Sequence, residues 1–256
     1  MSSPLKECLR ATGGRVAAAL LRLRSEPYVL RPGGALVVAP HPDDETLGCG
    51  GLLAAKAQAG HAVCVVFVTD GSGSHPGHPL LPPDELARRR RTEALSALGE
   101  LGVPAAQAHF LEARDGTLDR LDPAAAMALT QRITAIIRDF RPAEVLTTWE
   151  EDGSTEHAAA ARLTRAALAA AGGGYLLEYP IWAWWDPRRL GRRLGPGARN
   201  LSFPLGPLLP VKRRALARHR SQTDATAPWT EAVLPAAISR GCGGPTEFFF
   251  PSHVSA

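Results

Sequence analysis

Short apolar runs alternate with helix-like segments from residue 35 onward. The runs at 35–39 and 62–68 consist mainly of Val, Ala and Leu and are bounded by Gly, Pro, Thr or Asp, which is typical of buried strands. Further strands are predicted at 109–111, 144–149 and 175–182. Helices are predicted at 50–60, 84–102, 123–140, 156–171 and 211–222, and loops rich in Pro and Gly at 71–83 and 186–210.

This alternation predicts an α/β fold with a mostly parallel sheet and helices on both faces. Parallel strands need crossover connections of this length, and such sheets bind ligands at the carboxyl ends of their strands. The segment 15–30 reads as an amphipathic helix, and Arg22 and Arg24 make it too charged to cross a bilayer. We therefore expect a helical lead-in at 1–30 and a single domain at 31–256, with an Arg-, Pro- and Gly-rich loop at 186–210.

Composition is that of an ordinary globular protein, with 45% hydrophobic and 21% charged residues. The formal charge is only +4 and its basic residues are spread over three segments, so we expect solvated surfaces and no nucleic-acid partner. The four cysteines are far apart and form no CxxC pair, which favours reduced thiols. With no secretory signal and no transmembrane segment evident, we expect a cytoplasmic protein; the sequence allows a homo-oligomer.

The first polar motif follows the strand at 35–39 directly and contains one histidine and three consecutive acids, His41-Pro-Asp43-Asp44-Glu45. Crowded carboxylates repel one another unless a cation neutralises them, and helix capping explains only one acid. His41 and Asp44 are three residues apart, close enough to bind one ion. Zn²⁺ takes nitrogen and oxygen ligands of this kind.

A second polar motif, Glu150-Glu-Asp-Gly-Ser154-Thr-Glu-His157, also follows a strand and begins a helix. A third metal ligand is expected from another strand end, and His157 fits that place. The predicted metal set is therefore His41, Asp44 and His157. Zn²⁺ is the expected ion, and Fe²⁺ suits the same donors.

The order and spacing of these motifs resemble the LmbE/PIG-L family of zinc-dependent N-deacetylases. The resemblance rests on Pro-His-Pro-Asp-Asp-Glu at 40–45, Thr-Asp-Gly at 69–71, Arg90-x-x-Glu93, Asp-Gly at 115–116, Glu-His at 156–157 and His-Arg-Ser-Gln at 219–222. It covers residues 35 to about 222. It implies a Rossmann-like fold, a zinc ion, and removal of an N-acetyl or other acyl group from an amino-sugar-containing small molecule.

The resemblance also implies roles for individual residues. His41, Asp44 and His157 would bind the zinc ion, and Asp43 would be the general base that activates a zinc-bound water. The family usually has His-x-Asp-His in the second motif, where this chain has Ser154-Thr-Glu-His157. The group that stabilises the oxyanion is therefore open: Ser154, His219, His75 and His78 are the candidates. We assign Asp43, Ser154 and His219 to catalysis.

Three further residues are assigned to substrate binding: Arg90, Asp70 and Trp182. Arg90 shares a helical stripe with Leu86 and Ala94, so it faces the core and needs a partner, for which Glu93, Asp43 and a substrate oxygen are candidates. Trp182, in a group with Tyr179, Trp184 and Trp185, is placed to stack on a sugar ring or to pack in the core. The adjacent arginines at 188–193 allow an anionic substrate.

Two other functions remain open on the sequence alone. One is an amidase that acts on a thiol-sugar conjugate. The other is a non-catalytic zinc- or sugar-binding homologue, because Ser154 replaces the usual histidine. An intact Asp43 argues against the second, since a binding protein has no need of a base. A nucleotide-dependent enzyme is disfavoured because the glycines at 48–51 follow an acidic turn that would repel a pyrophosphate.

Overall fold

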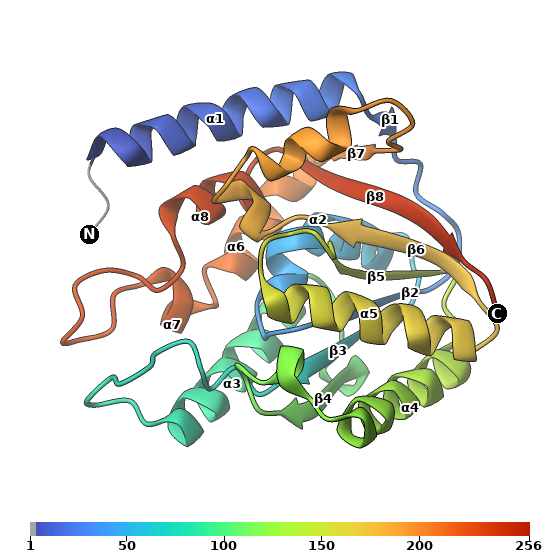
Figure 1. Ribbon diagram of the computed structural model, residues 1–256, viewed down its shortest axis with the longest axis horizontal. Coiled ribbons are helices and arrows are strands. Elements are labelled where there is room, and N and C mark those ends of the chain that lie inside the picture. Colours follow the sequence, from blue (N-terminus) through green and yellow to red (C-terminus); the bar gives the residue numbers. More distant parts are fainter. Residues whose placement is uncertain (1–3) are drawn as a thin grey trace.

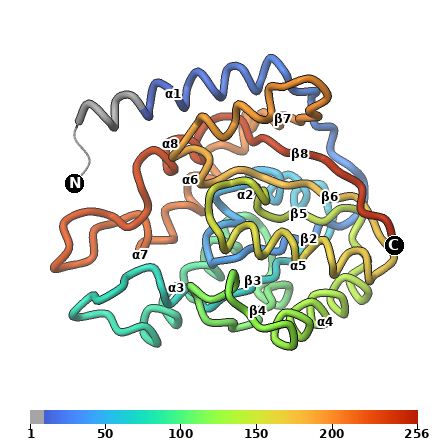
Figure 2. The backbone as a smooth tube through the Cα atoms, in the orientation of Figure 1, coloured from blue at the N-terminus to red at the C-terminus, as the bar shows by residue number. Residues whose placement is uncertain are grey.

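The computed structural model describes the backbone of residues 4–256 and the side chains of residues 10–256. A single eight-stranded sheet runs through the centre, with helices packed on both faces (Figures 1 and 2). Its strands are β1 Glu26–Pro27, β2 Ala35–Ala39, β3 Val63–Thr69, β4 Ala108–Ala113, β5 Glu144–Thr148, β6 Gly174–Tyr179, β7 Leu201–Pro204 and β8 Thr246–Val254. The α-helices are α1 Pro4–Leu23, α2 Asp44–Gln58, α3 Pro83–Glu100, α4 Pro123–Phe140, α5 Thr155–Ala170, α6 Leu209–Leu216, α7 Arg220–Thr223 and α8 Ala236–Cys242.

The strand order is β1-β7-β8-β6-β5-β2-β3-β4, and all pairs are parallel except those made by β8. The chain leaves β2 toward β3 and β4 on one side, and later returns to place β5 and β6 on the other. The order therefore reverses between β2 and β5. In open α/β sheets this reversal is where ligands bind, beyond the carboxyl ends of the strands. The mostly parallel α/β fold that the sequence predicts is confirmed.

Each central strand is apolar on both faces because both faces are covered. Val37, Val65 and Leu146 pack in a core with α1, α2 and α3, whereas Val38, Val66 and Val145 pack in a second core beneath α4 and α5. Figure 1 shows α4 and α5 side by side on one face, and α1 packs against α8 and the 3₁₀ helix Arg189–Leu194. Burial on both faces explains why these strands appear in the sequence as continuous runs rich in Val and Leu.

The sequence prediction is wrong in the last third of the sheet. It has no strand in the loop at 186–210, where β7 lies, and none after residue 222, where β8 lies. It also continues β6 to Trp182, whereas the strand ends at Tyr179 and Trp182–Trp184 form a 3₁₀ turn. Both missed strands contain a proline, which normally argues against a strand, and their partners are distant in sequence.

Several helix boundaries also differ from the prediction. Helix α1 ends at Leu23, seven residues before the expected end, because Glu26–Pro27 pairs with β7. Helix α2 begins at Asp44, inside the first polar motif, and not at residue 50. The helix expected at 211–222 is two helices, α6 and α7, with His219 at the break. The helix expected to start with an Asp84 cap begins at Pro83.

Strand β8 is held in the sheet by a buried ion pair. Lys212 of α6 donates to Glu247 of β8 (2.7 Å), and Glu247 also accepts from the backbone N–H groups of Gly51 and Leu52 (2.7 and 2.9 Å). Lys212 donates as well to the carbonyl of Leu47 (2.8 Å). These contacts join α2, α6 and β8. Strand β8 is therefore anchored to α2, the helix that begins within the first polar motif.

Among the helices that the structure describes, none combines the length with the apolar character needed to cross a lipid bilayer.

Candidate metal and catalytic site

Loops after β2, β3, β4 and β5 bring the polar motifs together at one edge of the sheet. His41, Asp43 and Asp44 follow β2, Asp115 follows β4, and the second motif follows β5. The strands β5, β2, β3 and β4 are parallel neighbours, so their carboxyl ends lie together. The strand order therefore places Asp43 and the three predicted metal ligands, although these residues are up to 116 positions apart.

His41, Asp44 and His157 form one cluster. The Nδ1 atom of His41 lies 3.0 Å from Oδ2 of Asp44, and Nε2 of His157 lies 3.5 Å from Oδ1 of the same carboxylate. Ligand atoms from all three side chains fall within 4.8 Å of one another. Asp44 and His157 are buried and His41 is partly buried. Two imidazoles on one carboxylate match the donor set that Zn²⁺ prefers.

His157 carries the clearest mark of a metal ligand. Its Nδ1 atom is 2.6 Å from Oδ2 of Asp152, while its buried Nε2 atom has no hydrogen-bond partner in the structure. A carboxylate that binds one ring nitrogen of histidine commonly orients the other nitrogen toward a metal. The donors therefore fit a bound cation, with the Nε2 atom of His157 as one of its ligands.

Asp152 also fixes the segment that follows β6. Its two carboxylate oxygens accept hydrogen bonds from the backbone N–H groups of Ile181, Trp182 and Ala183, at 2.8–2.9 Å. The side chain is completely buried. One carboxylate thus sets both the orientation of His157 and the position of the Trp182 turn.

The other nitrogen of His41 faces more acids. Its Nε2 atom lies 2.8 Å from Glu156 and 3.2 Å from Asp115, so these three residues form a second group with metal-ligand geometry. Burial alone would lower the pKa of His41, but the hydrogen bonds with Asp115, Asp44 and Glu156 outweigh burial and raise it well above its ordinary value. The three carboxylates thus favour a cation at this position, either a proton on the imidazole or a metal ion in its place.

Asp43 is oriented by Arg90, the side chain that the sequence places toward the core. A terminal nitrogen of Arg90 donates to Oδ1 of Asp43 (3.0 Å), and the guanidinium also donates to the carbonyls of Pro42 and Gly71. Of the partners considered for Arg90, Asp43 is the one observed, because Glu93 instead accepts from Ser221 and Arg89.

The environment of Asp43 favours its protonated form more than water does. Burial raises the pKa of Asp43 to about 6, and Arg90 acts in the opposite direction. A carboxylate in this range can accept a proton and release it again near neutral pH, as a general base and acid must.

A cavity of about 400 Å³ opens beside these residues. Ser154 and Trp182 both line it, and Trp182 is 37% exposed, whereas Trp184 and Tyr179 are buried in the core. Ser154 is the N-cap of α5, and its hydroxyl oxygen accepts from the backbone N–H of His157 (3.3 Å). Because the oxygen is the acceptor there, the hydroxyl hydrogen is free to point into the cavity.

The remaining sequence candidates lie outside the cavity lining. His219 is buried, as its helical face predicts, but its Nε2 atom contacts the Thr46 hydroxyl (3.2 Å). Asp70 accepts from the backbone N–H groups of Ser72 and Asp115 (2.9 and 3.1 Å) and so shapes the loop. His75 and His78 pack against Trp229, with His75 stacked on the indole ring.

Three site residues were not assigned from sequence: Asp115, Glu156 and Asp152. Asp115 lies just beyond the strand expected at 109–111, and the other two lie in the motif that supplied His157. Position at a strand end was a usable signal for all three. What sequence did not show is that β4 lies two strands from β2 on the same edge, which places Asp115 against His41.

Comparisons with known proteins agree with this geometry. Residues 36–168, just over half of the chain, match the sequence profile of the PIG-L family, described as GlcNAc-PI de-N-acetylase. One relative is a 1D-myo-inositol 2-acetamido-2-deoxy-alpha-D-glucopyranoside deacetylase of Kineococcus radiotolerans, 32% identical over an alignment of 173 residues that covers 56% of this chain and 47% of the relative. The chain thus spans about half the length of that relative.

A diacetylchitobiose deacetylase of Thermococcus kodakarensis is 29% identical over 73% of this chain and 69% of its own. Among solved structures, a deacetylase of teicoplanin biosynthesis has a TM-score of 0.63 at 21% identity and covers 87% of this chain and 98% of its own. The hydratase GalB of Pseudomonas putida has a TM-score of 0.60 at 18% identity, covering 88% and 97%. These two structures establish the fold, and the fold by itself accommodates more than one reaction.

Proposed function

Because the chain belongs to the PIG-L family of de-N-acetylases, we propose that it is a metal-dependent hydrolase that removes an N-acetyl or similar acyl group from an amino sugar. The observation that carries the proposal is the pairing of two sites at one sheet edge. One is a His-Asp-His set with an unpartnered buried nitrogen on His157, and the other is a buried acid, Asp43, oriented by Arg90.

His41, Asp44 and His157 are the proposed ligands, with Zn²⁺ as the expected ion and Fe²⁺ as the alternative. A bound ion of this kind lowers the pKa of water and polarises an amide carbonyl. The choice of His157 over the group of His41, Asp115 and Glu156 rests on Asp152, which orients His157 as second carboxylates do in metal sites.

Asp43 is the proposed general base. It lines the cavity next to Asp44, and its Oδ1 atom is held by Arg90, which leaves Oδ2 to accept a proton from the attacking water. Protonated Asp43 can then donate to the departing amine, since an amine leaves an amide readily only when protonated. Arg90 acts in this proposal by positioning Asp43.

Ser154 is the proposed donor to the oxyanion. Of the four candidates weighed from sequence, it is the one found among the residues that line the cavity. Its hydroxyl oxygen is engaged at the start of α5, which aims the hydrogen away from the helix. A single hydroxyl is a weaker donor than a charged imidazole, so we expect a slower enzyme than one with histidine at this position.

The substrate class follows from the rest of the lining. Trp182 offers a partly exposed ring for an apolar sugar face, and the carboxylates of Asp115 and Glu156 can accept hydrogen bonds from sugar hydroxyls. The relatives act on N-acetylglucosamine linked to inositol or in chitobiose. We propose a small N-acylated amino-sugar glycoside for this chain as well.

One experiment distinguishes the proposed deacetylase from a thiol-sugar amidase and from a non-catalytic binding protein. The purified protein is stripped of metal, reloaded with one equivalent of Zn²⁺ or Fe²⁺, and assayed for free amine from N-acetylglucosamine, diacetylchitobiose, an N-acetylglucosaminyl inositol and its cysteine-amide conjugate. Metal-dependent release from the acetylated sugars supports the deacetylase, and release from the cysteine amide alone supports the thiol-sugar amidase. Stoichiometric metal with no release from any of them contradicts the hydrolase and favours a binding protein.

A further inference from the structure

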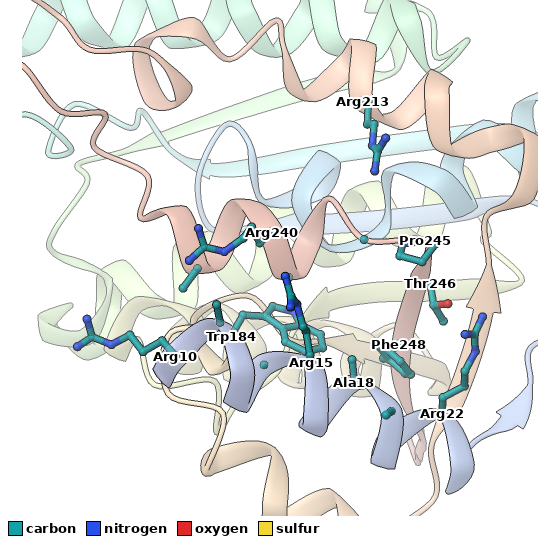
Figure 3. Close-up of a pocket in the computed structure, with 16 residues that line it drawn as sticks. Arg10, Arg15, Ala18, Arg22, Trp184, Arg213, Arg240, Pro245, Thr246 and Phe248 are labelled. Atoms are coloured by element: carbon teal, nitrogen blue, oxygen red, sulfur yellow. The ribbon is translucent and has the colours of Figure 1, made fainter. Parts of the chain in front are cut away.

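A second and larger cavity, of about 650 Å³, lies between α1, α6 and α8 (Figure 3). It shares no lining residue with the cavity beside His41. Trp184 and Phe248, both almost fully buried, contribute apolar surface, with Ala18 of α1 beside them. A volume of this size exceeds that of a single small ion and accommodates an organic ligand.

The charged side chains that line this cavity are all arginines. They come from three helices, and Figure 3 shows Arg15 extending from α1 toward α8. The arginines are Arg10, Arg15, Arg22, Arg213 and Arg240. Among the residues whose side chains are described, no carboxylate lines the cavity.

Two of the cavity arginines differ from neighbouring arginines in having no ion-pair partner among the described side chains. On and just after α6, Arg214 and Arg218 both pair with Glu100, at 3.1 and 2.5 Å. Arg213, next in sequence to Arg214, instead lines the cavity and has no ion pair within residues 10–256, and the same holds for Arg15. Unneutralised arginines around one concave surface create a local positive potential that favours anions.

Two buried polar groups at the cavity also lack partners. The hydroxyl of Thr246, a residue 91% buried, has no hydrogen-bond partner, and neither does the buried Nη1 atom of Arg10. Buried polar groups in native proteins are nearly always hydrogen-bonded, because an unpaired one costs free energy. Both residues line the cavity, and an anionic ligand there would supply the acceptor that the Thr246 hydroxyl lacks; the Arg10 guanidinium lies over the ring of Trp185, 3.7 Å from its centroid, outside that lining.

We propose that this cavity binds the phosphate or pyrophosphate group of an organic ligand, at a site separate from the hydrolase centre. Arginine is suited to phosphate because its planar guanidinium donates two parallel hydrogen bonds to neighbouring oxygens. The apolar part of the ligand packs against Trp184 and Phe248. The ligand is either a soluble phosphorylated compound or the headgroup of an anionic lipid.

The lipid source has one structural argument in its favour. Val16, Leu20 and Leu23 form a stripe on the outer face of α1, and they are 53%, 42% and 81% exposed. The stripe lies next to Arg15 and Arg22 on the helix, so apolar and basic side chains adjoin, as in helices that bind membrane surfaces.

The test measures phosphate binding in two arms with the full chain. In the first, calorimetry at low salt follows the binding of inorganic pyrophosphate. In the second, sedimentation follows binding to vesicles of phosphatidylglycerol, with phosphatidylcholine vesicles for comparison. The variant Arg15→Gln/Arg213→Gln removes two cavity charges. The matched control is Arg88→Gln/Arg141→Gln, which removes two charges from exposed arginines outside the cavity lining.

We expect the cavity double variant to weaken pyrophosphate binding at least tenfold relative to wild type, and significantly more than the control variant does. Thr246→Val leaves the net charge unchanged and is expected to weaken binding severalfold while the thermal midpoint of the free protein stays the same or rises. Vesicle binding that pyrophosphate displaces assigns the phosphate to a lipid, and pyrophosphate binding without vesicle binding assigns it to a soluble ligand. Absence of binding in both arms, or equal binding by all variants, overturns the proposal.

Discussion

Two clusters of buried charge lie at opposite ends of the same central strands. At the amino end, Lys56 of α2 pairs with Glu144 of β5 (2.6 Å) and also donates to the carbonyls of Arg31 and Gly33, while Tyr28 donates to Glu144. At the carboxyl end, Asp43, Asp44, Asp115 and Glu156 crowd around one arginine and two histidines.

The two clusters differ in how completely their charges are neutralised. The amino-end cluster has one ammonium and one carboxylate, and its polar atoms find partners within the protein. The carboxyl-end cluster has more acids than bases and leaves Nε2 of His157 without a partner. A satisfied buried pair stabilises one fold, whereas an acid surplus with an unpartnered ligand atom is typical of a site that binds a cation.

The largest effect is expected at the carboxyl end, from Asp43→Asn. The asparagine cannot accept a proton, so kcat/KM for amine release should fall on the order of 10³–10⁴-fold. The thermal midpoint of the metal-free protein should stay the same or rise, because burial disfavours the charged carboxylate. Asp84→Asn, an exposed acid on α3, is the control. Activity within tenfold of wild type would remove Asp43 from the mechanism.

The matching change at the amino end, Lys56→Met, should act on stability and not on chemistry. It leaves Glu144 charged, buried and unpaired, which costs about 3–5 kcal/mol of unfolding free energy. Urea unfolding measures this loss, and kcat of the folded enzyme should be unchanged. The double variant Lys56→Met/Glu144→Gln should recover most of the stability, since glutamine still accepts from Tyr28. A stable single variant would show that the pair contributes little.

Ser154→Ala separates the proposed oxyanion donor from the cap it also forms. Loss of the donor should lower kcat by about 10²-fold, and loss of the cap should cost about 1 kcal/mol of stability. Ser154→Thr keeps the hydroxyl and should retain most of the activity. Steady-state kinetics with an acetylated amino sugar gives kcat and KM separately. An unchanged kcat in the alanine variant would shift the role to another group.

Asp152→Asn tests whether Asp152 orients His157 for metal binding, and of the four predictions it should have the smallest effect. The amide orients the imidazole less well, so affinity for Zn²⁺ should fall by about 10–100-fold. Competition with a chromophoric chelator measures that affinity. Asp186→Asn is the control, because Asp186 pairs with Arg188 at the surface of the same region. Equal zinc affinity in both variants would argue that His157 is not a ligand.

Local sequence patterns were sufficient to predict the strands and polar turns at the centre of the molecule. Strands β2, β3 and β5 were predictable because burial on both faces demands uninterrupted apolar runs, and the turns after β2 and β5 carry His41, Asp44 and His157. The inward face of Arg90 was predictable in the same way, from helical spacing. These features depend on residues close together in the chain.

Contacts between groups that are distant in the chain became visible only in the folded protein. Asp115 reaches His41 because β4 lies in the same parallel set of strands as β2. Arg90 pairs with Asp43 and not with Glu93. The carboxylate of Glu93 instead accepts hydrogen bonds from Ser221 and Arg89. Strand β8 exists because β6 and β7 offer it partners on both edges. Hydrogen bonds and ion pairs between remote segments depend on chain topology, which no local pattern of side chains encodes.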